Sequence, residues 1–311
     1  MSKLGLALGG GGARGLAHIG VLKILDKEKI RITSITGCSM GAIVGGLYAY
    51  FKNAAEVEDF VLKAIKDSSF EKLGIDTFNS SKINQDKNYF DQIVNYISER
   101  LNAIKVMGHV SYFDEEITNE IYDLIPDKPI ESLGIKFSAI ATDLISGEEI
   151  NFTHGSLRKV VKASSAIPGI FPPVEIDDNL LVDGSSSESV PVGRVKDIGA
   201  DRVLAVDVSR CLKTIRPAKN ILDILYRTED ITSHHLSLIR LKEADLVIQP
   251  KVKQLSWADF NKVNEIIKAG EIEATDNLDK IKKLTQRNVY LLEMGQYLKK
   301  IKGYTDKEIT N

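Results

Sequence analysis

The sequence predicts an α/β protein with a mainly parallel central sheet and helices on both faces. The first 51 residues run as strand, loop, helix, strand, turn and helix, an order typical of right-handed parallel crossovers. Three later apolar runs each end at an aspartate, as strands do where the chain enters a loop. A chain of 311 residues, 43% of them hydrophobic, can fill the core of one large domain.

The first four elements follow from the spacing of apolar residues. Leu4–Leu8 is a short apolar run closed by glycines, which predicts a buried strand. Leu16–Glu28 has apolar residues at helical spacing and predicts a helix. Ile32–Thr36 is a β-branched strand, and Met40–Phe51 is a helix dense in small residues.

The middle of the chain, from about residue 56 to residue 127, is polar and helical in pattern. Tyr89–Leu101 and Glu115–Leu124 are its amphipathic stretches. Few strand-like runs interrupt it, so we predict a helical insertion that flanks the sheet.

The second half returns to strand character and ends in helices. We predict one domain over residues 1–275 and a helical C-terminal tail over residues 276–311, in which Leu292–Ile301 offers one apolar stripe. A helix is predicted over Ile221–Leu241. The predicted strands of this half are Phe137–Ala141, Leu180–Val182, Val203–Val206 and Leu246–Ile248.

Composition excludes several classes of protein and partner. A net charge of -2 gives no support for nucleic-acid binding. Two cysteines, Cys38 and Cys211, cannot build a disulfide framework and are typical of a reduced, intracellular chain. Leu4–Ala13 lacks a signal-peptide cleavage site, and Thr33–Phe51 contains too many glycines for a transmembrane helix. We therefore expect a cytoplasmic protein without a membrane span.

A Gly-x-Ser-x-Gly motif stands between the second strand and its helix. Gly37 and Gly41 flank Ser39 at two places on either side, the spacing of a sharp turn that exposes a nucleophile at a helix N-terminus. The helix dipole and its free N–H groups would favour a developing oxyanion. The alternative is a serine that only caps a helix. On such a turn the neighbouring Cys38 is expected to point away and to pack.

A second glycine-rich turn follows the first strand. Gly10, Gly11 and Gly12 can align successive N–H groups as an anion-binding loop. Gly10–Gly15 also match the dinucleotide fingerprint G-x-G-x-x-G, but the second strand lacks the acidic residue that would hold a ribose. The loop therefore fits an oxyanion hole better than a cofactor site. Arg14 either orders this loop, holds a negative group of the substrate, or is a solvated surface charge.

The residues alone leave the general base open. Asp143, Asp183 and Asp207 each follow a predicted strand, and the carboxyl ends of parallel strands share one edge of a sheet. Gly184 favours Asp183, because a glycine lets the backbone crowd a reacting centre. Ser39, Asp183 and His234 have the chain order of a hydrolase triad, but His234 lies within a predicted helix. No spacing of histidines and carboxylates suggests a metal site.

Taken together, these motifs resemble the bacterial patatin-like phospholipases. The resemblance extends from the first strand to about Gly270 and leaves the C-terminal tail unmatched. It rests on the order of five motifs: Gly10–Gly15, Gly37–Gly41, Thr142–Leu144 with Gly147, Ala163–Pro173 and Asp183–Gly184.

The resemblance implies a three-layer α/β fold and a serine–aspartate dyad that needs no histidine, metal or organic cofactor. Ser39 would attack an acyl ester, Asp183 would take its proton, and amides of Gly10, Gly11 and Gly12 would hold the oxyanion. Asp143 and Asp207 would then be structural. The substrate would be a lipid or another acyl ester, met in transient contact with the inner face of the membrane.

The sequence departs from the family pattern in two places, and two functions other than hydrolysis are compatible with its motifs. Ser185 stands where the family usually has glycine or alanine, and Ser187, Glu188 and Ser189 replace asparagines that are common shortly afterwards. Glu188 would disfavour anionic head groups or alter the pKa of the aspartate. An acyltransferase would use the same dyad. A non-catalytic nucleotide-binding regulator would use the glycine loop. Neither the natural substrate nor the oligomeric state follows from the sequence.

Overall fold

The described residues form one mixed sheet of eight strands. The structure, a computed structural model, describes residues 2–72, 115–209, 221–252 and 254–286, together with residues 111, 113 and 212. The strands lie in the order β5-β6-β3-β2-β1-β7-β8, and β4 pairs with β3. Their bounds are β1 Leu4–Leu8, β2 Ile32–Gly37, β3 Lys136–Asp143, β4 Glu149–Phe152, β5 Val174–Ile176, β6 Asn179–Asp183, β7 Arg202–Val206 and β8 Leu246–Ile248.

The centre of the sheet is parallel and one edge is antiparallel. β3, β2, β1, β7 and β8 pair in parallel, which confirms the predicted α/β class. β4 and β6 both run antiparallel to β3, and β5 runs antiparallel to β6. The sequence did not predict β4 and β5, because both are short and β4 is only half-buried, so neither has a strong apolar pattern.

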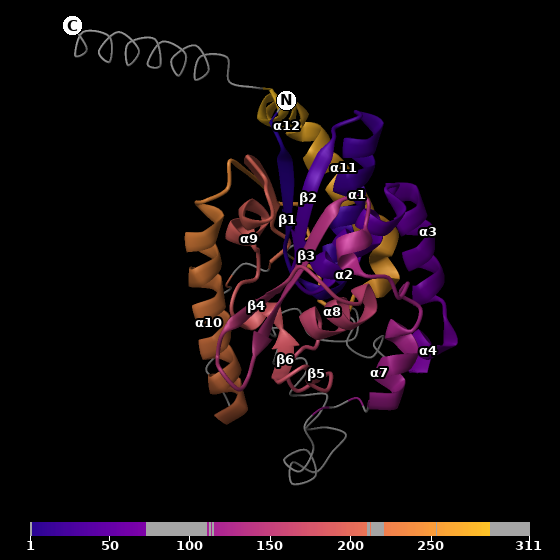
Figure 1. The fold of residues 1–311 in the computed structure, drawn as a ribbon, viewed down its shortest axis with the longest axis vertical. Coiled ribbons are helices and arrows are strands. Elements are labelled where there is room, and N and C mark those ends of the chain that lie inside the picture. The colour runs from indigo at the N-terminus through magenta and orange to yellow at the C-terminus, as the bar shows by residue number, and fades with distance from the viewer. Residues whose placement is uncertain are drawn as a thin grey trace, which may run out of the picture.

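Helices cover both faces of the sheet, in three layers. Figure 1 shows α9 and α10 on one side, and α1, α2, α3 and α11 on the other. The helices of the described residues are α1 Ala17–Lys27, α2 Met40–Phe51, α3 Ala54–Ile65, α4 Ser68–Lys72, α7 Glu115–Tyr122, α8 Leu157–Ser164, α9 Val192–Asp197, α10 Ile221–Leu241, α11 Val263–Asp276 and α12 Leu278–Thr285.

The alternation of side chains along the buried strands divides the core between the two faces. Leu4, Leu6 and Leu8 of β1 belong to the larger core cluster, which includes residues of α1 and α2. Ala7 points to the other face, where it packs with Val195 of α9 in a smaller cluster. The missing side chain at Gly5 of β1 lets α9 approach the sheet, because a Cβ atom there would lie 2.7 Å from Cγ2 of Val195.

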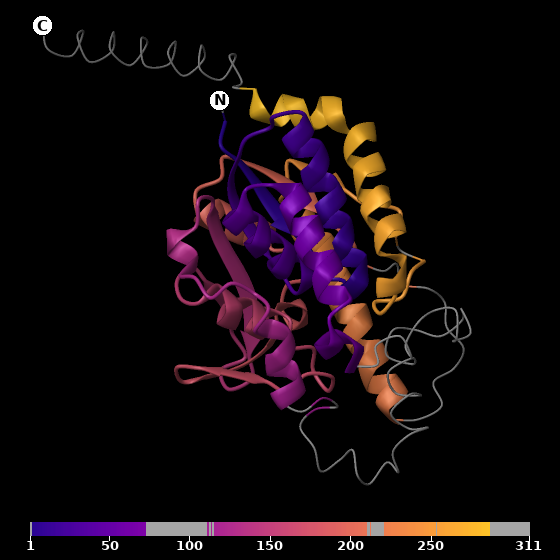
Figure 2. The same cartoon turned by 90° about the vertical axis from the view of Figure 1, so that its right-hand side faces the viewer.

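The α1 and α11 helices lie in close contact along one side of the molecule (Figure 2). Glycines make this approach possible, because a Cβ atom at Gly20 of α1 would collide with the backbone of Ile267. A Cβ atom at Gly270 of α11 would likewise collide with the carbonyl of Ala17. The pair therefore fixes the C-terminal helices against the N-terminal part of the fold.

The predicted helical insertion is helical where the structure describes it. α3, α4 and α7 lie within or overlap residues 56–127, whereas Tyr89–Leu101 falls outside the described residues. α12 covers the first part of the predicted tail, and Leu292–Ile301 also falls outside. None of the described helices is long and apolar enough to span a bilayer.

Candidate active site

Ser39 sits on a strained turn between β2 and α2. Its backbone has φ 52° and ψ −124°, a region that residues other than glycine rarely occupy. A Cβ atom at Gly37 would lie 2.5 Å from the backbone of Ala42, and one at Gly41 would collide with the carbonyl group of Leu8. Both flanking glycines are therefore required for this turn, as the sequence pattern predicts.

The turn is held by backbone hydrogen bonds on both sides of Ser39. The Ser39 N–H donates to the carbonyl and the hydroxyl oxygens of Ser164, each at 3.1 Å. The Ser39 carbonyl accepts from Ala42 and Ile43 in the first turn of α2. Only 5% of Ser39 is exposed, so its hydroxyl faces a mostly enclosed space.

Asp183 is a buried carboxylate at the same turn. It is 1% exposed, and its Oδ1 atom accepts hydrogen bonds from Ser185. To its Oδ1 atom, the Ser185 N–H donates at 2.9 Å and the Ser185 hydroxyl at 2.7 Å. Burial raises the pKa of Asp183, and the polar groups of Ser39, Ser185 and Cys38 oppose that rise.

The route by which Asp183 reaches this position differs from the predicted one. The sequence places it at the carboxyl end of a parallel strand, but β6 runs antiparallel to β3. In this register Asp183 pairs with Ala141, two residues before β3 ends at Asp143. Gly37 pairs with Ala139 of the same strand. Asp183 therefore lies at the end of β6 that is away from the β5–β6 turn. In the sheet it is level with the turn that follows Gly37.

Cys38 does not point away as expected. Its side chain is fully buried, and its Sγ atom lies 3.7 Å from Oδ1 of Asp183. Burial raises the pKa of the Cys38 thiol, and the nearby Asp183 carboxylate raises it further. Cys38 is thus a neutral thiol that donates a weak hydrogen bond to the carboxylate.

The glycine loop after β1 lies directly against Ser39. A Cβ atom at Gly10 would be 3.2 Å from Cβ of Ser39. The Gly10 N–H donates to the carbonyl of Ser189 at 2.9 Å, so this amide is already engaged. Within the described residues, the N–H groups of Gly11 and Gly12 have no such partner. These two N–H groups therefore remain available as hydrogen-bond donors beside Ser39.

Two buried side chains hold the glycine loop. Arg14 is 5% exposed and donates from Nε to the Val208 carbonyl at 3.1 Å and from Nη1 to the Leu255 carbonyl at 3.2 Å. These bonds order the loop, which was one of the predicted roles for Arg14. His18 lies 2.8 Å from the Gly9 carbonyl through Nε2, and burial lowers its pKa to about 4. The neutral His18 therefore donates that bond.

The other strand-end aspartates serve the backbone. Asp143 accepts from the N–H groups of Ile145, Ser146 and Leu180 at 2.9–3.2 Å, and the hydroxyl of Ser146 lowers its pKa to about 2. Asp207 accepts from the side-chain amide of Gln249 at 2.6 Å and from the N–H of Ser209. Among the described residues, neither forms a hydrogen bond with Ser39.

No histidine of the described residues hydrogen-bonds to Ser39 or Asp183. His234 and His235 both lie on α10, with ring centroids 5.8 Å apart. His154 bonds to Thr153, and His109 falls outside the described residues. In the same described part of the chain, no three metal-binding side chains gather in one place.

Glu188 is a buried carboxylate that faces α10. It is 3% exposed, and its carboxylate lies 3.7 Å from Nε of Arg240 on α10. Burial and the neighbouring carboxylate of Glu149 raise the pKa of Glu188 to about 8. Arg194 of α9 bonds in turn to Glu149. The Glu188 carboxylate thus faces Arg240 on α10, and its influence on head groups stays a prediction.

An apolar cavity of about 130 Å³ adjoins Ser39. Its walls come from α2, α3, α4 and α7, and from two aromatic residues that precede α11. The Tyr122 hydroxyl, which hydrogen-bonds to Ser165, is one of few polar groups on the wall. The apolar side chains of the wall include Met40, Ile43, Leu47, Phe60, Phe171 and Phe260.

The chain is similar to several known proteins. It is 32% identical over 209 residues to an uncharacterised NTE-family protein of Mycobacterium tuberculosis, covering 67% of this chain and 49% of that one. It is 33% identical over 207 residues to lysophospholipase NTE1 of Cryptococcus neoformans, covering 66% of this chain and 11% of that one. The chain thus spans about half the length of the mycobacterial relative and far less of the fungal one.

A solved structure and a family profile also match the chain. VipD from Legionella pneumophila aligns with a TM-score of 0.48 at 14% identity, covering 90% of this chain and 67% of that one. The profile of the family described as patatin-like phospholipase matches residues 6–195, a range that contains the glycine loop, Ser39 and Asp183. The chain belongs to the patatin-like phospholipase family.

Proposed function

We propose that this protein hydrolyses fatty-acyl esters of lipids through a covalent acyl-serine intermediate. Ser39 is the nucleophile and Asp183 is its general base. The observation that carries the proposal is the position of Ser39. It stands on a strained turn beside an apolar cavity, and the buried Asp183 carboxylate lies at the same turn, 3.7 Å from Sγ of the neighbouring Cys38. A nucleophile, a base within reach and an apolar binding wall are the parts that ester cleavage of a lipid needs.

The first half of the reaction forms the acyl-enzyme. The Ser39 Oγ attacks the ester carbonyl carbon while its proton passes to Asp183. The negative charge that develops on the carbonyl oxygen is stabilised by the N–H groups of Gly11 and Gly12. Asp183 then returns the proton to the leaving alcohol oxygen as the ester C–O bond breaks.

The second half releases the fatty acid. Asp183 takes a proton from a water molecule, which attacks the acyl-serine carbonyl, and the proton then returns to Ser39 as the acid leaves. The raised pKa of Asp183 makes it a stronger base than a solvated aspartate. It acts only when ionised, so the activity falls at acidic pH.

The cavity favours an apolar acyl chain over a polar acyl group. Its side chains give a fatty chain dispersion contacts and displace water from the ester. Lysophospholipids are the first substrates to test, because a relative bears the name lysophospholipase. Such substrates lie in lipid aggregates, which is consistent with the predicted transient membrane contact.

Three variants test the dyad. Ser39→Ala and Asp183→Asn should each lower the hydrolysis of a chromogenic fatty-acyl ester by at least about 10³-fold with the fold retained in circular dichroism. Ser39→Ala should also abolish labelling by a fluorophosphonate. Asp207→Asn is the matched control, because it changes a strand-end aspartate that does not contact Ser39. Near-normal turnover in Asp183→Asn would remove the assigned base.

Two further measurements separate this proposal from its alternatives. The double variant His234→Ala with His235→Ala should keep wild-type turnover, and its inactivation with the fold intact would favour a histidine triad. Product analysis with and without an added alcohol acceptor distinguishes hydrolysis from acyl transfer. If free fatty acid forms only as a minor product beside a new ester, the protein is a transferase.

A further inference from the structure

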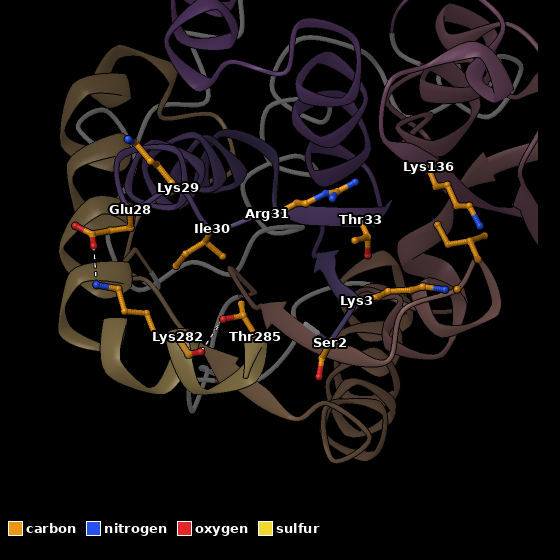
Figure 3. A pocket seen from close by; sticks show the side chains of 12 residues that line it. Ser2, Lys3, Glu28, Lys29, Ile30, Arg31, Thr33, Lys136, Lys282 and Thr285 are labelled. Carbon is orange, nitrogen blue, oxygen red and sulfur yellow. Dashed lines mark hydrogen bonds and ion pairs between the residues drawn. The ribbon is translucent and has the colours of Figure 1, made fainter. Parts of the chain in front are cut away.

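A second hollow lies at the end of the sheet opposite Ser39. Its volume is about 480 Å³ (Figure 3). Lys3 precedes β1, Arg31 precedes β2, Lys136 begins β3 and Gly199 lies shortly before β7, and all four residues line the hollow. Because these strands are parallel, the hollow gathers their amino ends, whereas Ser39 follows the carboxyl end of β2.

The lining of this hollow is strongly cationic. Five lysine and arginine residues line it against one carboxylate, that of Glu28. Glu28 already pairs with Lys282 at 2.7 Å, as Figure 3 also shows. The cationic residues are Lys3, Lys29, Arg31, Lys136 and Lys282.

Four of these cations have no acidic partner within the described residues. A further carboxylate, that of Asp201, accepts the backbone N–H of Lys3 at 3.0 Å. Five cations against the carboxylates of Glu28 and Asp201 leave an excess of positive charge. The whole chain has a net charge of -2, so this excess is local and does not follow from composition.

The side chains are arranged to receive a ligand from one side. Lys3 and Lys136 end on the same side of the hollow, whereas Lys29 extends away from it (Figure 3). The Lys136 Nζ atom lies only 3.4 Å from the position that a Cβ atom would take on Gly199. A residue with a side chain at position 199 would therefore crowd this ammonium group.

The neutral polar groups of the hollow are already engaged. The hydroxyl of Thr33 donates to the Leu4 carbonyl at 3.0 Å, and that of Thr285 donates to the Lys282 carbonyl at 2.8 Å. The donors left for a ligand are therefore the charged groups. Ile30 and Ile198 supply apolar surface for an organic portion.

We propose that this hollow binds a phosphate-bearing anion with at least two negative charges, held by Lys3, Arg31 and Lys136. Unpaired cations that face one hollow repel one another, and a multivalent anion relieves that repulsion for several of them at once. A volume of about 480 Å³ is within the range of small-molecule sites. The binding is charge-dependent and weakens as the salt concentration rises.

The phosphate can belong to a free anion or to a lipid head group, and two probes distinguish these sources. Inorganic pyrophosphate is titrated calorimetrically into the full chain at low salt. Vesicles of phosphatidylcholine with and without phosphatidic acid are tested by co-sedimentation. Pyrophosphate should also raise the melting temperature, because it binds only the folded state. Binding to pyrophosphate indicates a free anion, and binding only to phosphatidic acid vesicles indicates a lipid head group.

Variants locate the binding. The double variant Lys3→Ala with Lys136→Ala should weaken the binding of the anion about tenfold. Each exposed ion pair contributes roughly up to fivefold, and the variant removes two of them. Lys242→Ala with Lys251→Ala removes the same charge from exposed positions elsewhere and should bind as the wild type does. Arg31→Gln gives a second, independent loss. No binding of either probe to the wild type, or equal binding in the Lys3 and Lys136 double variant, would overturn the proposal.

Discussion

The hydroxyl of Ser185 offers a direct test of how Asp183 is tuned. It donates to Oδ1 of Asp183 at 2.7 Å, beside the Ser185 backbone N–H at 2.9 Å. Ser185→Ala removes the hydroxyl and leaves the N–H in place. Because both bonds stabilise the ionised carboxylate, the variant should bind a proton at Asp183 more readily than the wild type does.

The magnitude follows from the strength of one hydrogen bond to a charged group. Such a bond contributes about 1.5–3 kcal/mol, and about 1.36 kcal/mol corresponds to one pH unit. Ser185 is half-buried, so water partly replaces its hydroxyl, and the lower end of that range applies. The acidic limb of the activity profile should therefore move up by about one pH unit. Activity at high pH should stay close to that of the wild type.

The assay is kcat/KM of a soluble acyl ester measured across pH, which reports the free enzyme. Ser187→Ala is the control, because the Ser187 hydroxyl donates to the Gly184 carbonyl at 3.1 Å and has no bond to Asp183. The control profile should overlay that of the wild type. An acidic limb in Ser185→Ala that stays in place or moves to lower pH would refute this account of Asp183.

The remaining predictions concern the glycine loop. Gly12→Ala should destabilise the fold by about 2 kcal/mol or more in urea, because Gly12 has φ 57° and an added Cβ atom would lie 2.6 Å from the Trp257 carbonyl. Gly147→Ala, with φ 77° and open space around it, should lose only about 1 kcal/mol. The pKa of His18 is lowered to about 4 in the folded protein, so between pH 6.5 and pH 4 the unfolded chain binds a proton there more readily. The melting temperature of the wild type should therefore fall over this pH range. His18→Gln should make that fall smaller. Parallel curves for wild type and variant would contradict the role of His18 beneath Gly9.

The parts of the site that are local in sequence could be predicted. The turn at Ser39 is specified by Gly37 and Gly41, whose missing side chains make room for the neighbouring backbone. The parallel strands β1 and β7 are buried on both faces, so each reads as a nearly continuous apolar run, whereas β2 is recognised by its β-branched residues. In these elements the local pattern and the tertiary packing favour the same structure.

The parts that depend on distant pairing could not be predicted. The direction of β6 is set by its pairing with β3 and by its hairpin with β5, neither of which has a local signal. The engagement of the Gly10 N–H depends on Ser189, far along the chain. The bonds of Arg14 to Val208 and Leu255 are likewise long-range, so the sequence around Arg14 does not specify them.

Several features that oppose stability meet at this one place in the fold. Ser39 has a left-handed backbone, and Asp183 is a buried carboxylate whose raised pKa records an unfavourable environment for its charge. The Nδ1 atom of His18 is buried beneath the same glycine loop and has no hydrogen-bond partner among the described residues. Each costs stability that an ordinary core residue would not, and such costs gather where a chain is selected for chemistry. A serine that only capped a helix would need none of them.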